Sequence, residues 1–380
     1  MKEVYFDHAA TTPLRKEVLN EMIPYLNRYY GNASSLYNIG KISKIAIEKA
    51  RKQVAYAINC KQEEVYFTSC GSESDNLAIK GFCLANKKKG NHIITSKIEH
   101  PGVINTCKNL EDKGFKVTYL NVDKYGFVSL DELKASIRTD TILITIMTAN
   151  NEIGRIQNIR EIGEIAHNNN IVFHTDAVQA IGNIDIDVKN MKIDMLSMSA
   201  HKFYGPKGVG ALYVKSGLDF ERIQDGGHQE KNKRAGTENV YGIVGLGKAI
   251  ELAKDNLERY NRKLLYLRDY CIYQLRNNIK NIKINGDLYQ RLPGNISVSF
   301  RNCNANEILL ELNKAGICVS TGSACSCGTP SYVLEAIGLE KEWINGTIRI
   351  TLGEENTIEE INYLIYNLSN ILYEFWQNVN

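Results

Sequence analysis

The chain has 380 residues, of which 43% are hydrophobic and 23% are charged. This balance is typical of folded globular proteins, so it excludes general disorder, and the length is sufficient for two or three domains. Lysine and arginine total 46 while aspartate and glutamate total 43, which gives a net charge of +3. A charge this small provides no whole-protein field that would attract nucleic acid or an anionic membrane.

The ends of the chain and its cysteines predict a cellular location. Glu3 and Asp7 lie where a secretory signal would place apolar residues. The most apolar stretch, 141–149, is much shorter than the ~20 residues that span a bilayer. We therefore expect a cytoplasmic protein. Nine cysteines in a chain of this length do not indicate a disulfide framework.

Between about residues 60 and 215, short segments rich in Val, Ile, Thr and Tyr alternate with amphipathic segments. The predicted strands are 63–69, 91–97, 116–122, 141–147, 170–177 and 193–200. The predicted helices between them include 74–90 and 159–170. This alternation predicts a mostly parallel sheet covered on both faces, with 209–215 as a candidate antiparallel strand.

The C-terminal part predicts a smaller α/β unit. A long helical pattern over 240–277 is followed by further elements at 295–300, 306–316, 317–322, 330–337 and 347–353 and by a final helix. We place the domain boundary near residue 255. The large domain is predicted to cover 15–255, and the small domain to combine 1–14 with 256–380.

Three segments, 174–179, 197–206 and 68–74, end predicted strands with reactive side chains, where open α/β sheets place their ligand sites. In the second of these segments, Lys202 follows a strand end and precedes the small turn GPKG, so we expect its amine in a pocket rather than on a helix face. A partly desolvated lysine has a lowered pKa and can form a Schiff base. Taken alone, a lysine is more often an exposed surface residue.

Asp176 and Gly71–Ser72 strengthen the case for a cofactor. Asp176 ends the predicted strand that precedes the lysine strand. Pyridoxal phosphate requires such a carboxylate, because it pairs with the pyridinium nitrogen. Gly71 and Ser72 begin a predicted helix, whose N–H groups could hold an anion. An ordinary helix capped by Ser72 or Ser74 is the simpler interpretation of that segment alone.

Two more residues are candidates for chemistry in the C-terminal part. Small residues surround Cys325 and predict an exposed loop, in which a thiol could act as a nucleophile. An inert free thiol is the alternative, and a metal set of Cys318, Cys325 and Cys327 fits no common zinc spacing. Arg349 lies among apolar strand residues and would either bind a carboxylate or form a structural ion pair.

A series of motifs in order along nearly the whole chain resembles one family. They are VYFDHAATTP, GNASSLYNIG, TSCGSESDNLAIKG, EHPGV, NNEIG, HTDAVQA, SAHKFYGPKGVGALYV, RAGTENV, STGSACSCG and IRITLG. The series resembles the cysteine desulfurases of the NifS/IscS type, which belong to the class V aminotransferase family of pyridoxal-phosphate enzymes. The resemblance implies the fold type I of these transferases, with a mixed, mostly parallel sheet in the large domain and a smaller α/β domain.

The resemblance also implies residue roles. Lys202 would bond pyridoxal 5′-phosphate covalently, His100 would stack on its ring and move protons, and Cys325 would accept sulfur. Asp176 would hold the ring nitrogen, Gln179 the phenolic oxygen, and Arg349 the substrate carboxylate, while Asn151 would contact cofactor or substrate. The implied phosphate-binding residues are Gly71, Ser72, Ser199, His201 and, across a homodimer interface, Thr237. No resident metal is implied; Cys325 would contact an iron–sulfur cluster at most transiently, through a persulfide.

The implied activity converts L-cysteine to L-alanine and passes the sulfur from Cys325 to an acceptor protein. The acceptor would be an iron–sulfur scaffold or a tRNA-thiolation enzyme. The chain itself would not bind nucleic acid or a membrane directly. The alternatives are a selenocysteine lyase, an aminotransferase, or a non-catalytic scaffold with the same fold. The Cys325 loop argues against an aminotransferase, and the intact Lys202, Asp176 and His100 argue against a scaffold. Cys327 and Cys70 depart from the usual motifs, as do the lysines of 228–237.

Overall fold

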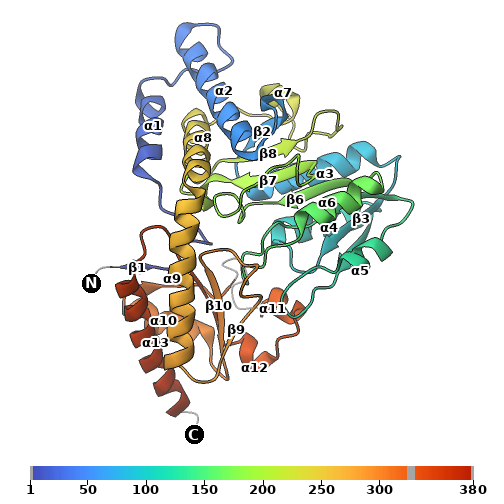
Figure 1. Ribbon diagram of the computed structural model, residues 1–380. Coiled ribbons are helices and arrows are strands. Elements are labelled where there is room, and N and C mark those ends of the chain that lie inside the picture. Colours follow the sequence, from blue (N-terminus) through green and yellow to red (C-terminus); the bar gives the residue numbers. More distant parts are fainter. Residues whose placement is uncertain (1–2, 323–329, 378–380) are drawn as a thin grey trace.

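The computed structural model describes residues 3–322 and 330–377, which form a mixed α/β protein around a seven-stranded sheet (Figure 1). The strand order in this sheet is β2-β8-β7-β6-β5-β3-β4. The strands are β2 (Val65–Thr68), β3 (His92–Ser96), β4 (Lys116–Leu120), β5 (Thr141–Thr145), β6 (Val172–Asp176), β7 (Met195–Ser199) and β8 (Gly210–Val214). Each predicted strand of this region is present and is two or three residues shorter than predicted.

Strand β8 runs antiparallel to both of its neighbours, as expected for 209–215, and the pairs β7–β6, β6–β5, β5–β3 and β3–β4 are all parallel. Helices cover both faces of the sheet, so the predicted fold class is confirmed. These helices are α1 (Lys16–Asn27), α2 (Asn38–Ile58), α3 (Gly71–Asn86), α4 (Pro101–Glu111), α5 (Leu130–Ala135), α6 (Ile159–Asn168) and α8 (Val240–Asp255).

Successive strand residues point to opposite faces of the sheet and enter two separate cores. On β3, Ile94 packs into the core shared with α2, α6 and α8, whereas Ile93 packs into the core shared with α3 and α4. On β7, Leu196 packs into the first of these cores and Met195 into the second. Burial on both faces explains why these strands read as continuous apolar runs rather than as alternating patterns.

The long helical pattern of 240–277 is divided into two helices at Asn256, where α8 ends and α9 (Leu257–Asn278) begins. A three-stranded antiparallel sheet follows in the order β12-β10-β9, with β9 (Ile282–Ile284), β10 (Asn295–Phe300) and β12 (Thr347–Thr351). The remaining helices are α7 (Gln229–Asn232), α10 (Ala305–Lys314), α11 (Tyr332–Ala336), α12 (Lys341–Ile344) and α13 (Ile358–Gln377).

The N-terminal segment packs with the C-terminal part, as expected, because β1 (Val4–Tyr5) pairs in parallel with β11 (Ile317–Cys318). Val4 and Phe6 share a core with residues of α9, β10 and α13. The predicted strand 317–322 is reduced to two residues, since only these pair with β1. The division into domains at 1–14, 15–255 and 256–380 stays a prediction.

The seven cysteines among the described residues are free thiols, in agreement with the prediction of no disulfide framework there. Within the same residues, no helix combines the length and the apolar character that a membrane span requires.

Candidate active site

A cavity of about 290 Å³ lies where β6 and β7 end and where α3 and α4 begin. Asp176 is the last residue of β6 and Ser199 the last residue of β7, while Met147 and Asn151 follow β5. The residues around the cavity are Ala9, Ala10, Cys70, Gly71, Ser72, Asp75, His100, Met147, Asn151, Asp176, Val178, Gln179, Ser199, His201, Lys202 and Arg349. The cavity therefore sits at the carboxyl edge of a largely parallel sheet, the usual ligand position in such folds.

Most of the site residues predicted from sequence meet in this one cavity. They are Gly71, Ser72, His100, Asn151, Asp176, Gln179, Ser199, His201, Lys202 and Arg349. Thr237 is exposed and does not line the cavity. Cys325 and Cys327 lie outside the described residues. The individual roles given above stay predictions, because proximity alone does not assign a role.

Lys202 ends a short 3₁₀ turn, Ala200–Lys202, that directly follows β7. Its Nζ donates hydrogen bonds to the backbone oxygens of Ala9 at 2.6 Å and Ala10 at 2.8 Å. Gln179 Nε2 donates to the same Ala9 oxygen at 3.0 Å. The N-terminal segment therefore forms a wall of the site. Ala9 and Ala10 were not predicted as site residues, although they lie in the motif DHAATTP.

The first turn of α3 opens onto the cavity. Cys70 is the N-cap and its side chain makes no capping hydrogen bond, so neither Ser72 nor Ser74 is the cap, contrary to the simpler interpretation. Ser74 Oγ lies instead 2.7 Å from Thr68 Oγ1. A Cβ atom at Gly71 would lie 2.5 Å from Val178 Cγ2, so any side chain there would force Val178 to move. The arrangement provides uncapped backbone N–H groups for an anion.

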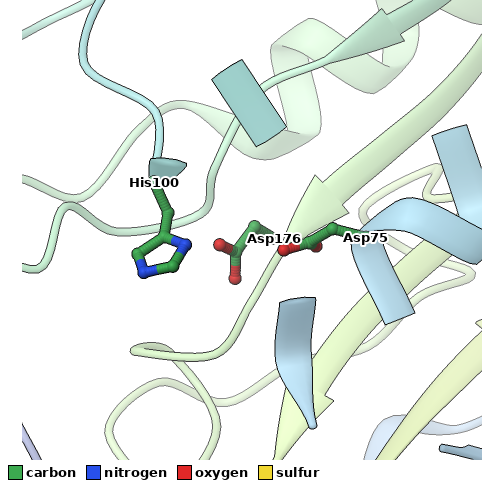
Figure 2. A group of neighbouring side chains, drawn as sticks. All are labelled: Asp75, His100 and Asp176. Atoms are coloured by element: carbon green, nitrogen blue, oxygen red, sulfur yellow. The ribbon is translucent and has the colours of Figure 1, made fainter. Parts of the chain in front are cut away.

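Two carboxyl groups and an imidazole gather at the cavity wall (Figure 2). A carboxylate oxygen of Asp75, one of Asp176 and a ring nitrogen of His100 all lie within 4.8 Å of one another. Asp176 Oδ1 accepts a hydrogen bond from the Val178 N–H at 2.9 Å, and His100 Nδ1 accepts one from the Gly102 N–H at 3.0 Å. Burial raises the pKa of both carboxyl groups and lowers the pKa of His100.

Asp75 was not among the predicted site residues. It lies four positions after Gly71 on α3, one helical turn away and on the same face, so the helix period was the signal that could have identified it.

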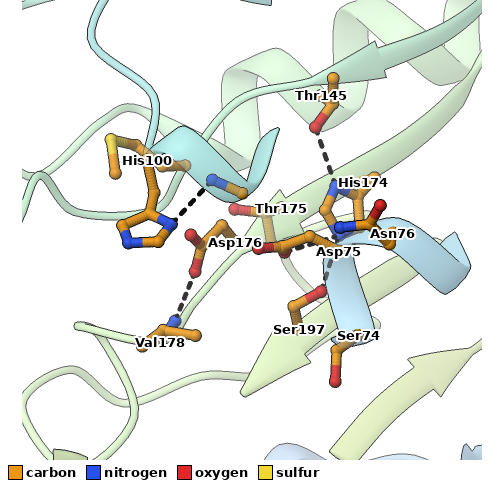
Figure 3. A network of polar contacts seen from close by, with 12 residues as sticks. Ser74, Asp75, Asn76, His100, Thr145, His174, Thr175, Asp176, Val178 and Ser197 are labelled. Atoms are coloured by element: carbon orange, nitrogen blue, oxygen red, sulfur yellow. Dashed lines mark hydrogen bonds and ion pairs between the residues drawn. The ribbon is translucent and has the colours of Figure 1, made fainter. Parts of the chain in front are cut away.

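Behind Asp75, a buried polar network continues into the sheet (Figure 3). His174 Nδ1 lies 2.8 Å from Thr145 Oγ1, and His174 Nε2 lies 3.0 Å from Ser197 Oγ and 3.8 Å from Asp75 Oδ1. Burial lowers the pKa of His174 to about 3, so its ring is neutral at physiological pH. His174 therefore offers Asp75 a dipole rather than a positive charge.

Arg349 is 2% exposed and forms an ion pair with Asp7, with Nη2 and Oδ1 2.8 Å apart. Its Nη1 donates to the backbone oxygens of Asn151 and Gly322, while its buried Nε has no hydrogen-bond partner among the described residues. Of the two alternatives left open by the sequence, the structural ion pair is present. Binding of a carboxylate at Arg349 stays a prediction.

Known proteins provide independent information about this site. The family model described as "Aminotransferase class-V" matches residues 4–364. A cysteine desulfurase IscS from Clostridium botulinum (strain Hall) is 53% identical over 375 residues, covering 98% of this chain and 94% of the relative.

Two solved structures are similar over almost their whole length. A NifS-like protein has a TM-score of 0.93 at 38% identity, covering 98% of this chain and 100% of its own. The structure titled "SspA in complex with cysteine" has a TM-score of 0.82 at 37% identity, covering 94% of this chain and 100% of its own.

Proposed function

The chain belongs to the class V aminotransferase family and within it to the cysteine desulfurases, and from this premise we propose how its cavity takes sulfur from L-cysteine. It is a pyridoxal-phosphate-dependent enzyme that releases L-alanine. The observation that carries the proposal is the convergence of Lys202, Asp176 and the open first turn of α3 on one cavity. One solved relative, SspA, is described in complex with cysteine, which supports this substrate.

The residues around the cavity fit the chemical groups of pyridoxal 5′-phosphate. The uncapped turn at Gly71 suits the phosphate, and the carboxylate of Asp176 suits the ring nitrogen. The His100 ring lies beside Asp176, which places an aromatic surface at the same position. When bound, the cofactor supplies an electron sink for bonds at the substrate α-carbon.

Lys202 is the proposed attachment point of the cofactor and the base that removes and returns the α-proton. The carbonyl oxygens of Ala9 and Ala10 orient its Nζ by two short hydrogen bonds. His100 is proposed to stack on the ring and to assist proton movement, with its Nδ1 fixed by the Gly102 N–H.

Arg349 and Asn151 are proposed to bind the substrate carboxylate. Nε of Arg349 is buried and has no hydrogen-bond partner among the described residues, so it can donate to an incoming oxygen. Asp7 holds the rest of the guanidinium and restricts its orientation. Gln179, Ser199 and His201 complete the cofactor contacts in this proposal, since all three line the cavity.

Cys325 is proposed to accept the sulfur. Its thiolate attacks the substrate sulfur; an S–S bond forms as the C–S bond breaks, and the carbon fragment takes a proton and leaves as alanine. The resulting persulfide passes to an acceptor in the cytoplasm, either an iron–sulfur scaffold or a tRNA-thiolation enzyme.

The activity is tested by incubating the holoenzyme with L-cysteine and a thiol reductant and measuring sulfide and alanine. We expect equal amounts of both products, a loss of turnover in Cys325→Ala, and retained turnover in the matched variant Cys327→Ala. Borohydride should fix the cofactor covalently in wild type and not in Lys202→Ala. A Cys325→Ala variant as fast as wild type would exclude the proposed sulfur acceptor.

Thr237 is proposed to reach the phosphate in the partner subunit of a homodimer, which its exposure permits. Thr237→Ala and Lys202→Ala should each be impaired alone. Mixed under conditions that exchange subunits, they should recover about a quarter of wild-type activity, because half the dimers then hold one intact site. No recovery in a mixture that demonstrably contains heterodimers would assign Thr237 to its own subunit or to no site.

A further inference from the structure

Asp75 forms part of the cavity wall and has no role in the reaction as described above. We propose that Asp75 and Asp176 act as one acid pair that holds a single proton, so that the pair presents one negative charge, normally carried by Asp176, to the ring nitrogen. In this pair Asp75 is a positioning residue that keeps the proton and takes over the charge when Asp176 cannot carry it. The inference rests on the proposed binding of the cofactor at this cavity.

The geometry supports a shared charge. The two side chains come from different elements, α3 and β6, yet their carboxylate oxygens lie within 4.8 Å (Figure 2). Asp75 is 1% exposed and Asp176 is 5% exposed, so water cannot screen them from each other. Two carboxylates this close in a buried site cannot both be ionised without strong repulsion, and such pairs titrate as a unit.

The surroundings decide which carboxyl group keeps the proton. The neighbouring His100, a hydrogen bond from the Val178 N–H to Oδ1, and Lys202 all favour the charged form of Asp176. Asp75 Oδ1 has no hydrogen-bond partner among the described residues. Burial and the neighbouring Asp176 both raise the pKa of Asp75. The charge therefore resides on Asp176, and the proton on Asp75.

The leading electrostatic influences on Asp75 come from acidic and thiol groups, and its ion-pair neighbour His174 lies 3.8 Å away. Titratable groups from several elements face Asp75. His174 and Asp176 belong to β6, Glu99 follows β3, and Cys70 precedes α3. His100 caps the start of α4, and Cys107 lies within that helix. His174 is neutral, and the carboxyl and thiol groups are neutral or negative, so they disfavour a second negative charge. Asp176 is the carboxyl group that lies within 4.8 Å of Asp75.

Removal of the Asp176 charge reverses this balance. With asparagine at 176, the repulsion from Asp176 disappears, while the burial that also raises the pKa of Asp75 remains. A positively charged ring nitrogen would then favour release of the Asp75 proton to solvent, which would make the Asp75 carboxylate the anion of this pair. Asp75 should then support part of the cofactor affinity that Asp176 normally provides. The pair therefore predicts that the double variant loses more cofactor affinity than the two single variants together.

A double-variant cycle tests the pair by dialysing each holoenzyme against graded pyridoxal 5′-phosphate and measuring the dissociation constant. We expect Asp75→Asn to change it less than about twofold and Asp176→Asn to raise it at least about tenfold. The double variant should raise it at least about fivefold beyond Asp176→Asn. As a matched control, the buried Asp194→Asn, which pairs with Lys215 outside the cavity, should add nothing to Asp176→Asn.

The visible absorption of the bound cofactor provides the second readout. Its pH titration should be unchanged in Asp75→Asn and should differ between Asp176→Asn and the double variant, which a purely structural role of Asp75 would not produce. Where Asp75→Asn fails to fold, Asp75→Ser replaces it. The pair is refuted when the double variant binds as tightly as Asp176→Asn, or when Asp75→Asn alone matches the loss of Asp176→Asn. A wild-type protein that binds no cofactor would instead overturn the proposed function, and the pair with it.

Discussion

The buried carboxyl group of Glu99 gives a quantitative prediction about the pH dependence of stability. Glu99 is fully buried between the ends of β3 and β5. Its Oε1 accepts from Ser96 Oγ at 2.6 Å, and both of its oxygens accept from the Met147 N–H, at 3.0 and 2.9 Å. Burial raises the pKa of Glu99 from 4.5 to about 8. The proton therefore stays on Glu99 in the folded chain at pH values where the unfolded chain has released it.

The sign and size of the effect follow from proton linkage. Between the unfolded pKa of 4.5 and the folded pKa of about 8, the folded state binds more protons, so stability falls as pH rises. Each pH unit in the middle of this window costs about 1.4 kcal/mol. From pH 5.5 to pH 7.5 the loss attributable to this one group is about 2.5 kcal/mol.

Glu99→Gln replaces the titratable carboxyl group with an amide, which can still accept a hydrogen bond from the Met147 N–H and can donate one to Ser96 Oγ. We expect the difference in unfolding free energy between variant and wild type to move by about 2.5 kcal/mol in favour of the variant from pH 5.5 to 7.5. Urea unfolding at both pH values with saturating cofactor measures this difference, and the exposed Glu355→Gln is the control. If the difference in unfolding free energy between variant and wild type is the same at both pH values, the claim that Glu99 is protonated in the folded chain is refuted.

Three other substitutions test separate parts of the structure. Gly71→Ala places a Cβ 2.5 Å from Val178 Cγ2, so the dissociation constant of the cofactor should rise about tenfold by equilibrium dialysis. Arg51→Met removes the ion-pair partner of the buried Glu230, whose Oε1 lies 2.7 Å from Arg51 Nη2 in the wild type. Unfolding in urea should show a loss of about 3–5 kcal/mol, which Glu230→Gln in the same background should partly recover. Arg349→Lys removes the planar guanidinium group that could bind a carboxylate through two N–H groups. KM for L-cysteine should therefore rise about tenfold while the absorption of the bound cofactor is unchanged. An unchanged KM would mean that Arg349 has a structural role only.

The amino-acid sequence by itself determined the sheet and the strand-end residues. Apolar runs bounded by polar turns located β5, β6 and β7, because strands buried on both faces must be apolar throughout. Asp176 and Ser199 end such strands, so their meeting at one sheet edge followed from local pattern and parallel order. The motif series added the family, which the comparisons confirmed over residues 4–364.

The tertiary structure alone decided which distant groups surround these residues. Ala9 and Ala10 reach Lys202 only because β1 pairs with β11 and brings the N-terminal segment over the sheet edge. Asp75 meets Asp176 only because α3 packs against the sheet with this face inward. Such contacts depend on how elements far apart in the chain pack, and no local period or propensity encodes that packing.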